Sequence, residues 1–155
     1  MDVIGVIPAR YSSTRFAAKV LADIMGKPML QHVWEHAKQS RMLDDLIIAC
    51  DNEIILKAAL KFGAKAVMTS KEHTCCSDRI SEVVNPVDVK IVINIQADEP
   101  LVHPMMIDSV ARALLEDKMM NMATLMKKID DVLELLDPNV VKVVVDKNNF
   151  ALYFS

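Results

Sequence analysis

Short apolar runs alternate along the chain with longer segments whose apolar residues recur at helical spacing. The apolar runs predict strands at residues 3–7, 46–50, 66–68 and 90–95. The periodic segments predict helices at residues 28–40, 52–62, 77–84 and 104–118, and a helical turn or two at 130–136. Because the strand runs lack polar alternation, we expect helices on both faces of the sheet. The pattern therefore predicts an α/β fold, doubly wound around a mostly parallel sheet.

The last part of the chain predicts a different arrangement. Residues 122–126 are a candidate strand, and residues 140–145 and 150–154 predict two strands joined by a turn at 147–149. Only Ser155 follows the second of these strands, so the hairpin leaves an exposed edge. We therefore interpret residues 1–155 as a single domain that ends in an incomplete β-hairpin and lacks its C-terminal part.

Composition narrows the class of protein. The chain has 155 residues, of which 52% are hydrophobic and 25% are charged, as expected for one globular domain. The net charge of −3 argues against a nucleic-acid-binding protein, which usually carries a basic excess. No apolar run reaches the ~18 residues that span a bilayer, and the first residues lack the pattern of a signal peptide. The expectation is a cytoplasmic protein that does not insert into membranes.

Sheets of this class bind ligands beyond the carboxyl ends of their strands. The loop after the first strand carries Arg10, Arg15 and Lys19, with hydroxyl groups between them and no acid. Arginine and lysine suit phosphate groups, so this loop is a candidate triphosphate site; a solvated basic loop is the alternative. The loop is neither a P-loop nor a G-x-G-x-x-G fingerprint, so the usual mononucleotide and dinucleotide signatures are absent.

An acidic loop follows the fourth predicted strand. Its residues are Gln96, Ala97, Asp98, Glu99 and Pro100. A carboxylate directly beyond a buried strand suits Mg²⁺, which commonly binds one or two carboxylates together with substrate phosphates and water. The alternative is that Asp98 or Glu99 only caps the next turn.

The loop after the third predicted strand contains His73, Thr74, Cys75 and Cys76 and leads to Arg79. A zinc site is disfavoured, because adjacent cysteines rarely share a tetrahedral site and the chain has no C-x₂-C pair. The chain's three cysteines are an odd number and two are adjacent, so they do not form a disulfide framework. For Arg79, a structural alternative is an ion pair with its neighbour Asp78 at the start of a helix.

Together these motifs resemble the N-terminal portion of the 3-deoxy-manno-octulosonate (Kdo) cytidylyltransferases, or CMP-Kdo synthetases, a family with a nucleotide-diphospho-sugar transferase-like fold. The similar segments extend along the whole chain, at residues 7–15, 26–29, 73–79, 94–100, 122–125, 137–144 and 151–155. The resemblance implies an enzyme that joins CTP and Kdo, an acidic eight-carbon sugar, into CMP-Kdo and pyrophosphate for lipopolysaccharide synthesis. It also implies Mg²⁺ as the cofactor and, in the full-length family, a homodimer.

The same resemblance implies roles for individual residues. Arg10 and Lys19 correspond to triphosphate contacts and Asp98 to the Mg²⁺ ligand, so these three are the candidate catalytic residues. The candidate substrate-binding residues are Ala9, Arg15, His73, Thr74, Cys75, Arg79 and Gln96, with positions 73–75 lining the cytosine pocket.

Three departures from the family pattern concern glycine. Ala18, Cys76 and Ala97 stand where the family usually has glycine in ligand-binding loops. If glycine supplies a positive φ at one of these positions, another residue there costs about 1–2 kcal/mol. A Cβ also restricts the approach of the backbone to phosphate or base.

With altered loops and one Mg²⁺ carboxylate, we expect impaired synthetase activity in this chain. Two alternatives stay open. One is a cytidylyltransferase for a related acidic sugar, and the other is a non-catalytic α/β homologue that acts as a binding or interaction domain.

Overall fold

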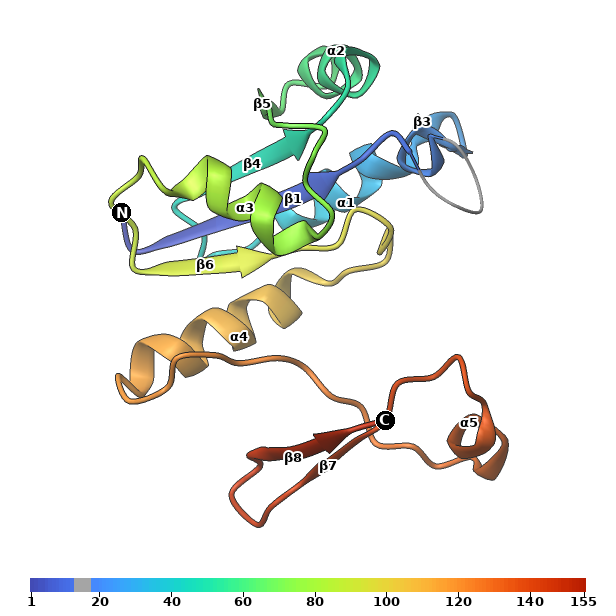
Figure 1. Cartoon of the computed structure of the whole chain (residues 1–155), viewed down its shortest axis with the longest axis vertical. Helices are drawn as coiled ribbons and strands as arrows, with labels where there is room; N and C mark the ends of the chain where they lie inside the picture. The colour runs from blue at the N-terminus through green and yellow to red at the C-terminus, as the bar shows by residue number, and fades with distance from the viewer. Residues whose placement is uncertain (13–17) are drawn as a thin grey trace. The chain divides into compact units, whose positions relative to one another are not determined.

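The central element of the fold is a four-stranded parallel sheet in the order β5-β4-β1-β6 (Figure 1). The computed structural model describes residues 1–12 and 18–155, which form two compact units, Met1–Ala123 and Thr124–Ser155. The sheet belongs to the first unit, and its strands are β1 (Val3–Ala9), β4 (Asp45–Cys50), β5 (Lys65–Met68) and β6 (Ile91–Asn94). These are the four strands that the apolar runs predict.

Helices cover both faces of this sheet. They are α1 (Met29–Ala37), α2 (Glu53–Lys61), α3 (Cys76–Val84) and α4 (Pro104–Glu116). The buried residues of β1 alternate between two apolar clusters, with Val3 and Ile7 in the cluster that includes α1, α2 and α4. Ile4 and Val6 pack in the other cluster, against α3. The predicted doubly wound α/β fold is therefore confirmed.

Local sequence explains where the helices begin and end. Asn52 caps α2, because its side chain accepts a hydrogen bond from Ile54 N at 2.8 Å. Gly63 follows the helix with φ +86°, a left-handed conformation that glycine adopts without a Cβ clash. Pro104 opens α4, where its missing N–H would have no helical acceptor. Asn52 and Gly63 thus mark the start and the end of the helix predicted at residues 52–62.

A small hairpin before α1 is absent from the predicted elements. Strand β2 (Asp23–Ile24) pairs antiparallel with β3 (Lys27–Pro28), and Met25 and Gly26 form the two-residue turn. Both turn residues have positive φ, +52° and +84°, as a type I′ turn requires. Two-residue strands are too short to carry a periodic apolar signal, so the pattern of the sequence misses them.

The second unit contains α5 (Val132–Leu136) and a hairpin of β7 (Val143–Val145) and β8 (Ala151–Phe154). The antiparallel pairing of β7 with β8 confirms the predicted hairpin. The strand predicted at residues 122–126 is wrong: this segment forms no strand, and Met122 and Met126 are 86% and 54% exposed. Apolar residues form a stable strand only where a neighbouring strand and a packed face receive them. Among the described helices, none is long and apolar enough to cross a membrane.

Candidate active site

The carboxyl ends of β1, β4, β5 and β6 lie at one edge of the sheet, because the four strands are parallel (Figure 1). Arg10, Asp51 and Thr69 are the first residues beyond β1, β4 and β5. The predicted site residues that the structure describes belong to this edge, to the loops that leave it or to the start of α3. Arg15 lies outside the described residues.

Lys19 and Asp98 meet at this edge, one from the segment after β1 and one from the loop after β6. Lys19 Nζ lies 2.8 Å from Asp98 Oδ2, and the two side chains are 45% and 46% exposed. Lys19 opens a short 3₁₀ helix, η1 (Lys19–Leu21), in which Leu21 N donates to Ala18 O at 2.8 Å. Because both side chains are accessible from solvent, the ammonium group can bind a phosphate oxygen and the carboxylate can bind a divalent cation.

The backbone around Arg10 is held on both sides, while its side chain is exposed. Ala9 is fully buried and pairs with Cys50 of β4, so it anchors the loop and presents no side chain to a ligand. On the other side, Tyr11 N donates a hydrogen bond to Asp51 Oδ1 at 2.8 Å. An exposed guanidinium on a fixed backbone is suited to bidentate phosphate contact.

The loop after β6 alternates between buried and exposed residues. Ile95 and Ala97 are buried in the core, at 3% and 6% exposure, whereas Gln96 and Asp98 are exposed. Gln96 Nε2 donates to Asn94 Oδ1 at 2.9 Å. The alternation places the amide of Gln96 and the carboxylate of Asp98 on the solvent side of the same loop.

A network around Glu82 of α3 shapes the loop after β5. Its carboxylate accepts a hydrogen bond from Ser70 N at 3.0 Å and pairs with His73 Nε2. The bond from the Ser70 N–H, followed by the contact with His73, holds the pKa of Glu82 below its usual value. Thr74 and Cys75 are exposed beyond this network, and Cys75 Sγ caps α3 by accepting from Asp78 N at 3.4 Å. The predicted cytosine-side residues therefore stand on a loop with fixed ends.

Arg79 lies beneath these loops, in the interior of the protein. It is 3% exposed, and its guanidinium donates to Asp51 Oδ2 at 3.1 Å, to the Thr69 hydroxyl and to Ser70 O at 3.2 Å. Its ion-pair partner is thus Asp51 and not the neighbouring Asp78. These contacts use the guanidinium to hold the loops, so the geometry supports a positioning role for Arg79.

The three positions where the family usually has glycine differ from one another. Ala18 has φ +54°, in the left-handed region that favours glycine, so the condition for a backbone cost is met at this position. Cys76 is the first residue of α3 and Ala97 is buried, and neither has a positive φ. The cost of losing glycine through backbone conformation therefore falls on Ala18 alone.

Among the predicted site residues that the structure describes, Asp98 is the one whose side chain could hold a magnesium ion. The described residues contain no group of three or more His, Cys, Asp or Glu side chains arranged to hold a metal. Magnesium needs fewer protein ligands than such a cluster supplies, because phosphates and water complete its shell. An exposed carboxylate such as that of Asp98, next to the ammonium group of Lys19, is compatible with this requirement.

Asp51 is the residue at this edge that sequence reasoning missed. It directly follows strand β4, as Asp98 closely follows β6, and this position beyond a strand is the sequence signal that could have identified it.

Its neighbour Cys50 is fully buried, and burial raises the pKa of its thiol, so this cysteine is unsuited to act as a nucleophile.

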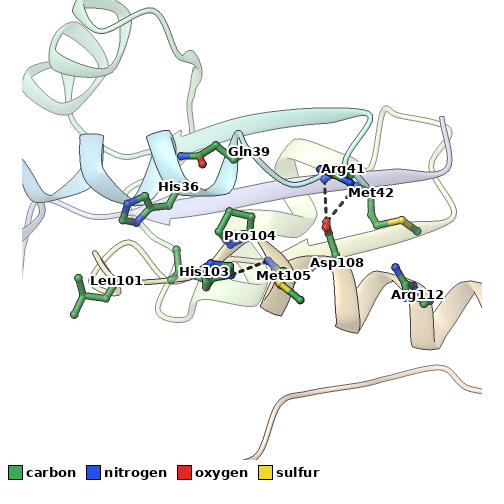
Figure 2. Close-up of a pocket in the computed structure, with 11 residues that line it drawn as sticks. His36, Gln39, Arg41, Met42, Leu101, His103, Pro104, Met105, Asp108 and Arg112 are labelled. Atoms are coloured by element: carbon green, nitrogen blue, oxygen red, sulfur yellow. Dashed lines mark hydrogen bonds between the residues drawn. The ribbon is translucent and has the colours of Figure 1, made fainter.

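A separate groove of about 640 Å³ lies between α1 and the start of α4 (Figure 2). None of the predicted site residues that the structure describes lines it. Its carboxylate, Asp108, accepts hydrogen bonds from Arg41 N and Met42 N at 3.0 and 3.2 Å, as Figure 2 shows. These bonds fasten α4 to the segment after α1, so this carboxylate is engaged in packing.

Known proteins resemble the chain along its whole length. The sequence profile of the cytidylyltransferase family matches residues 4–155. The 3-deoxy-manno-octulosonate cytidylyltransferase of Geotalea uraniireducens is 48% identical over 100% of the chain and 62% of that relative. The protein of the same name from Geobacter sulfurreducens is 44% identical over the same shares of the two chains.

Solved structures are also similar to the chain. A CMP:2-keto-3-deoxy-manno-octonic acid synthetase complexed with CTP superposes with a TM-score of 0.90 at 36% identity, over 100% of the chain and 64% of that structure. A cytidylyltransferase from Leptospira borgpetersenii, at 19% identity, shares the fold with a TM-score of 0.67 over 76% of the chain and 50% of that structure. The chain spans about 62% of the length of the curated relatives it matches.

Proposed function

The chain belongs to the cytidylyltransferase family, and we propose that the loop edge of its sheet binds CTP for the transfer of CMP to Kdo. The observation that carries the proposal is the contact between Lys19 and Asp98. It brings a phosphate-binding cation and a magnesium-binding carboxylate to one exposed place at the carboxyl ends of the strands. The names of the relatives, which are Kdo cytidylyltransferases, support the choice of sugar.

In this proposal Arg10 and Lys19 bind the triphosphate. Both side chains are exposed at the edge of the sheet, and neither belongs to a buried ion pair. Nucleotidyl transfer asks little covalent chemistry of a protein, so rate enhancement comes from positioning and from cations placed where negative charge develops. Two cations on fixed backbone segments provide this.

Asp98 holds Mg²⁺ in this proposal, together with phosphate oxygens and water. When bound, the ion offsets negative charge on the reacting phosphates. Lys19, the present partner of Asp98, then turns to a phosphate oxygen. A single carboxylate from the protein binds Mg²⁺ weakly in the absence of nucleotide, so we expect the ion and CTP to bind together.

The base and the sugar contact further residues in this proposal. His73, Thr74 and Cys75 line the cytosine side, where the pairing of His73 with Glu82 fixes the loop. Gln96 contacts the substrate from the loop after β6. The anomeric hydroxyl of Kdo releases its proton to water as its oxygen forms a bond to the α-phosphorus, the α–β phosphoanhydride bond breaks, and pyrophosphate leaves. For the whole protein we propose a cytoplasmic homodimer that makes CMP-Kdo for lipopolysaccharide synthesis.

Calorimetric titration of the purified chain with nucleotides in the presence of Mg²⁺ tests this proposal. We expect CTP to bind, and UTP, ATP and GTP to bind at least about tenfold more weakly, a difference of roughly 1.4 kcal/mol. Equal affinity for all four nucleotides would indicate that a basic loop binds the phosphate groups without recognising the base. Absence of binding would favour the alternative of an interaction domain that keeps the fold.

A pyrophosphate-release assay with CTP and Kdo addresses catalysis separately. We expect slow or undetectable turnover by the chain alone, because Asp98 is the one carboxylate assigned to the metal and Ala18 replaces a loop glycine. Turnover within the ordinary range of enzymes, about 1–10³ per second, would contradict this expectation.

A further inference from the structure

We propose that the buried ion pair between Asp51 and Arg79 sets the spacing between the phosphate-side loop and the base-side loop of the site. Both are positioning residues in this proposal, because each acts on the nucleotide through backbone that it holds. The role for CTP rests on the proposed function, whereas the role in holding the loops does not.

Each carboxylate oxygen of Asp51 accepts a hydrogen bond from a different segment at this edge of the sheet. Oδ1 accepts from Tyr11 N at 2.8 Å, and Oδ2 accepts from Arg79 Nη2 at 3.1 Å. Tyr11 directly follows Arg10, so the first of these bonds fixes the backbone from which the phosphate-binding guanidinium extends. The carboxylate therefore joins the loop after β1 to α3.

Arg79 continues the link to the loop after β5. Its Nη1 donates to the Thr69 hydroxyl and to Ser70 O, the latter at 3.2 Å. Thr69 is tied to β4 as well, because its N and its hydroxyl both donate to Cys50 O, at 2.8 and 3.0 Å. Through these bonds one ion pair connects the segments that follow β1, β4 and β5.

Burial makes this pair sensitive to single substitutions. The side chains of Arg79 and Asp51 are only 4% and 11% exposed. Removing one partner leaves a charge and several hydrogen-bonding groups without partners in a poorly hydrated place, so the surrounding segments must move to find others. The prediction is that a substitution at Arg79 affects the amide of Tyr11, which is hydrogen-bonded to Asp51 and not to Arg79.

The opposite edge of the same strands offers a matched control. Lys65 Nζ pairs with Asp45 Oδ1 at 2.7 Å, joining the first residues of β5 and β4, and the lysine side chain is 70% exposed. Lys65→Met therefore removes a cation from an ion pair between the same two strands, at the amino ends. The loops proposed to bind CTP follow the carboxyl ends of these strands, at the opposite edge of the sheet.

Hydrogen–deuterium exchange of the free protein tests the link directly. In Arg79→Met we expect the Tyr11 amide to exchange at least about tenfold faster than in the wild type, because Asp51 loses the partner that holds it. Arg79→Lys should fall between the two, since an ammonium keeps the charge but lacks the guanidinium's fork of donors. Lys65→Met should leave the Tyr11 amide unchanged. Unchanged exchange at Tyr11 in both Arg79 variants would overturn the proposal.

Folding is checked by thermal melting of each variant. If Arg79→Met does not fold, Arg79→Lys provides the same comparison with a smaller change of shape. Asp51→Asn removes the charge but keeps an oxygen that can accept from Tyr11 N, so we expect it to release Thr69 and Ser70 more than Tyr11.

Titration with CTP then tests the consequence for binding. We expect Arg79→Met and Arg10→Ala each to weaken CTP binding, and the double variant to lose less than the product of the two factors, because the ion pair acts by placing Arg10. CMP binding should change less than CTP binding in Arg10→Ala. Losses that multiply fully would contradict the link through Arg10. If the wild type binds no CTP, the proposed function fails, while the exchange experiment still decides the role of the ion pair.

Discussion

Lys19 Nζ and Asp98 Oδ2 lie 2.8 Å apart, although 79 positions separate the two residues along the chain. The parallel pairing of β1 with β6 produces this contact, since both residues follow carboxyl ends of adjacent strands. Both side chains are nearly half exposed, so their attraction is weakened by water and contributes about 0–1 kcal/mol to stability. A pair of this kind is better placed to receive a ligand than to hold the fold.

The first prediction concerns Lys19→Met and Asp98→Asn. Each should change the free energy of unfolding by less than about 1 kcal/mol, because the pair is exposed. Each should weaken binding of Mg·CTP by about tenfold or more, since a charge-assisted contact to phosphate or metal is lost. Urea denaturation and calorimetric titration measure the two effects on the same samples.

Lys57→Met is the matched control for this prediction. Lys57 pairs with Glu53 on the surface of α2, at 3.4 Å and with a side chain 77% exposed. Lys57→Met should leave CTP binding unchanged and should change the free energy of unfolding by at most a few tenths of a kcal/mol. If Lys19→Met binds Mg·CTP as tightly as Lys57→Met does, Lys19 does not contact the phosphate groups.

The second prediction concerns Ala18, which has φ +54°. Ala18→Gly should raise the free energy of unfolding by about 1 kcal/mol, because the left-handed conformation costs an alanine roughly that amount more than a glycine. Ala22→Gly is the control: with φ −55°, this position gains nothing from glycine and should lose stability. Urea denaturation of both variants decides, and destabilisation by Ala18→Gly would contradict the observed conformation.

A third prediction concerns the turn between β2 and β3. Met25 has φ +52° and is 95% exposed, so its side chain gains little packing while its backbone is strained. Met25→Asn should stabilise the protein by about 0.5–1 kcal/mol, because asparagine is favoured at this position of a type I′ turn. Met119→Asn, at a methionine 87% exposed without a positive φ, should show no such gain. Thermal melting compares the two variants, and equal effects would argue against a strained turn.

The fourth prediction concerns acid. Hydrogen bonds from the N–H groups of Val3 and Asp2 hold the pKa of Asp44 below its ordinary value of 3.8. A carboxyl group whose pKa is lowered in the folded state stabilises that state above its unfolded pKa, and this contribution is lost as the pH falls through the folded pKa. Thermal melting between about pH 5 and pH 2 should show this loss. In Asp44→Asn the decline should be shallower, and an unchanged acid profile would contradict the assignment.

Glu82 should respond to acid in the same direction. Its lowered pKa has its main cause in the Ser70 N–H, with His73 next, so protonation loosens the loop after β5. Below its ordinary pKa of 4.5, the protection of the Ser70 amide relative to its intrinsic exchange rate should decrease in the wild type as the pH falls. Glu82→Gln should show fast exchange at Ser70 already near neutral pH.

The sheet could be predicted from the sequence because its strands are buried on both faces. A strand such as β1, buried along its whole length, needs a continuous apolar run, and such runs are visible without a structure. The same reasoning fails at residues 122–126, which are apolar but exposed. Hydrophobicity identifies a strand only together with the neighbour that pairs with it, and the neighbour is a property of the fold.

The site could be predicted as a set of loops, but the roles within it could not all be assigned. Asp51 and Asp98 carry similar sequence signals, an acid just beyond a buried strand. The structure separates them, since the side chain of Asp51 is 11% exposed and that of Asp98 is 46% exposed. What distinguishes them is Arg79, which lies 28 positions after Asp51 and reaches it only in the folded protein.

Hydrogen–deuterium exchange with and without Mg·CTP tests most directly whether the carboxyl edge of the sheet is the nucleotide site. The account predicts that CTP slows exchange in peptides containing Arg10, Lys19, residues 69–75 and Asp98, and that UTP does so less. It predicts no change around Asp108 in the groove between α1 and α4 (Figure 2). Protection of that groove with none at the carboxyl edge would contradict the account.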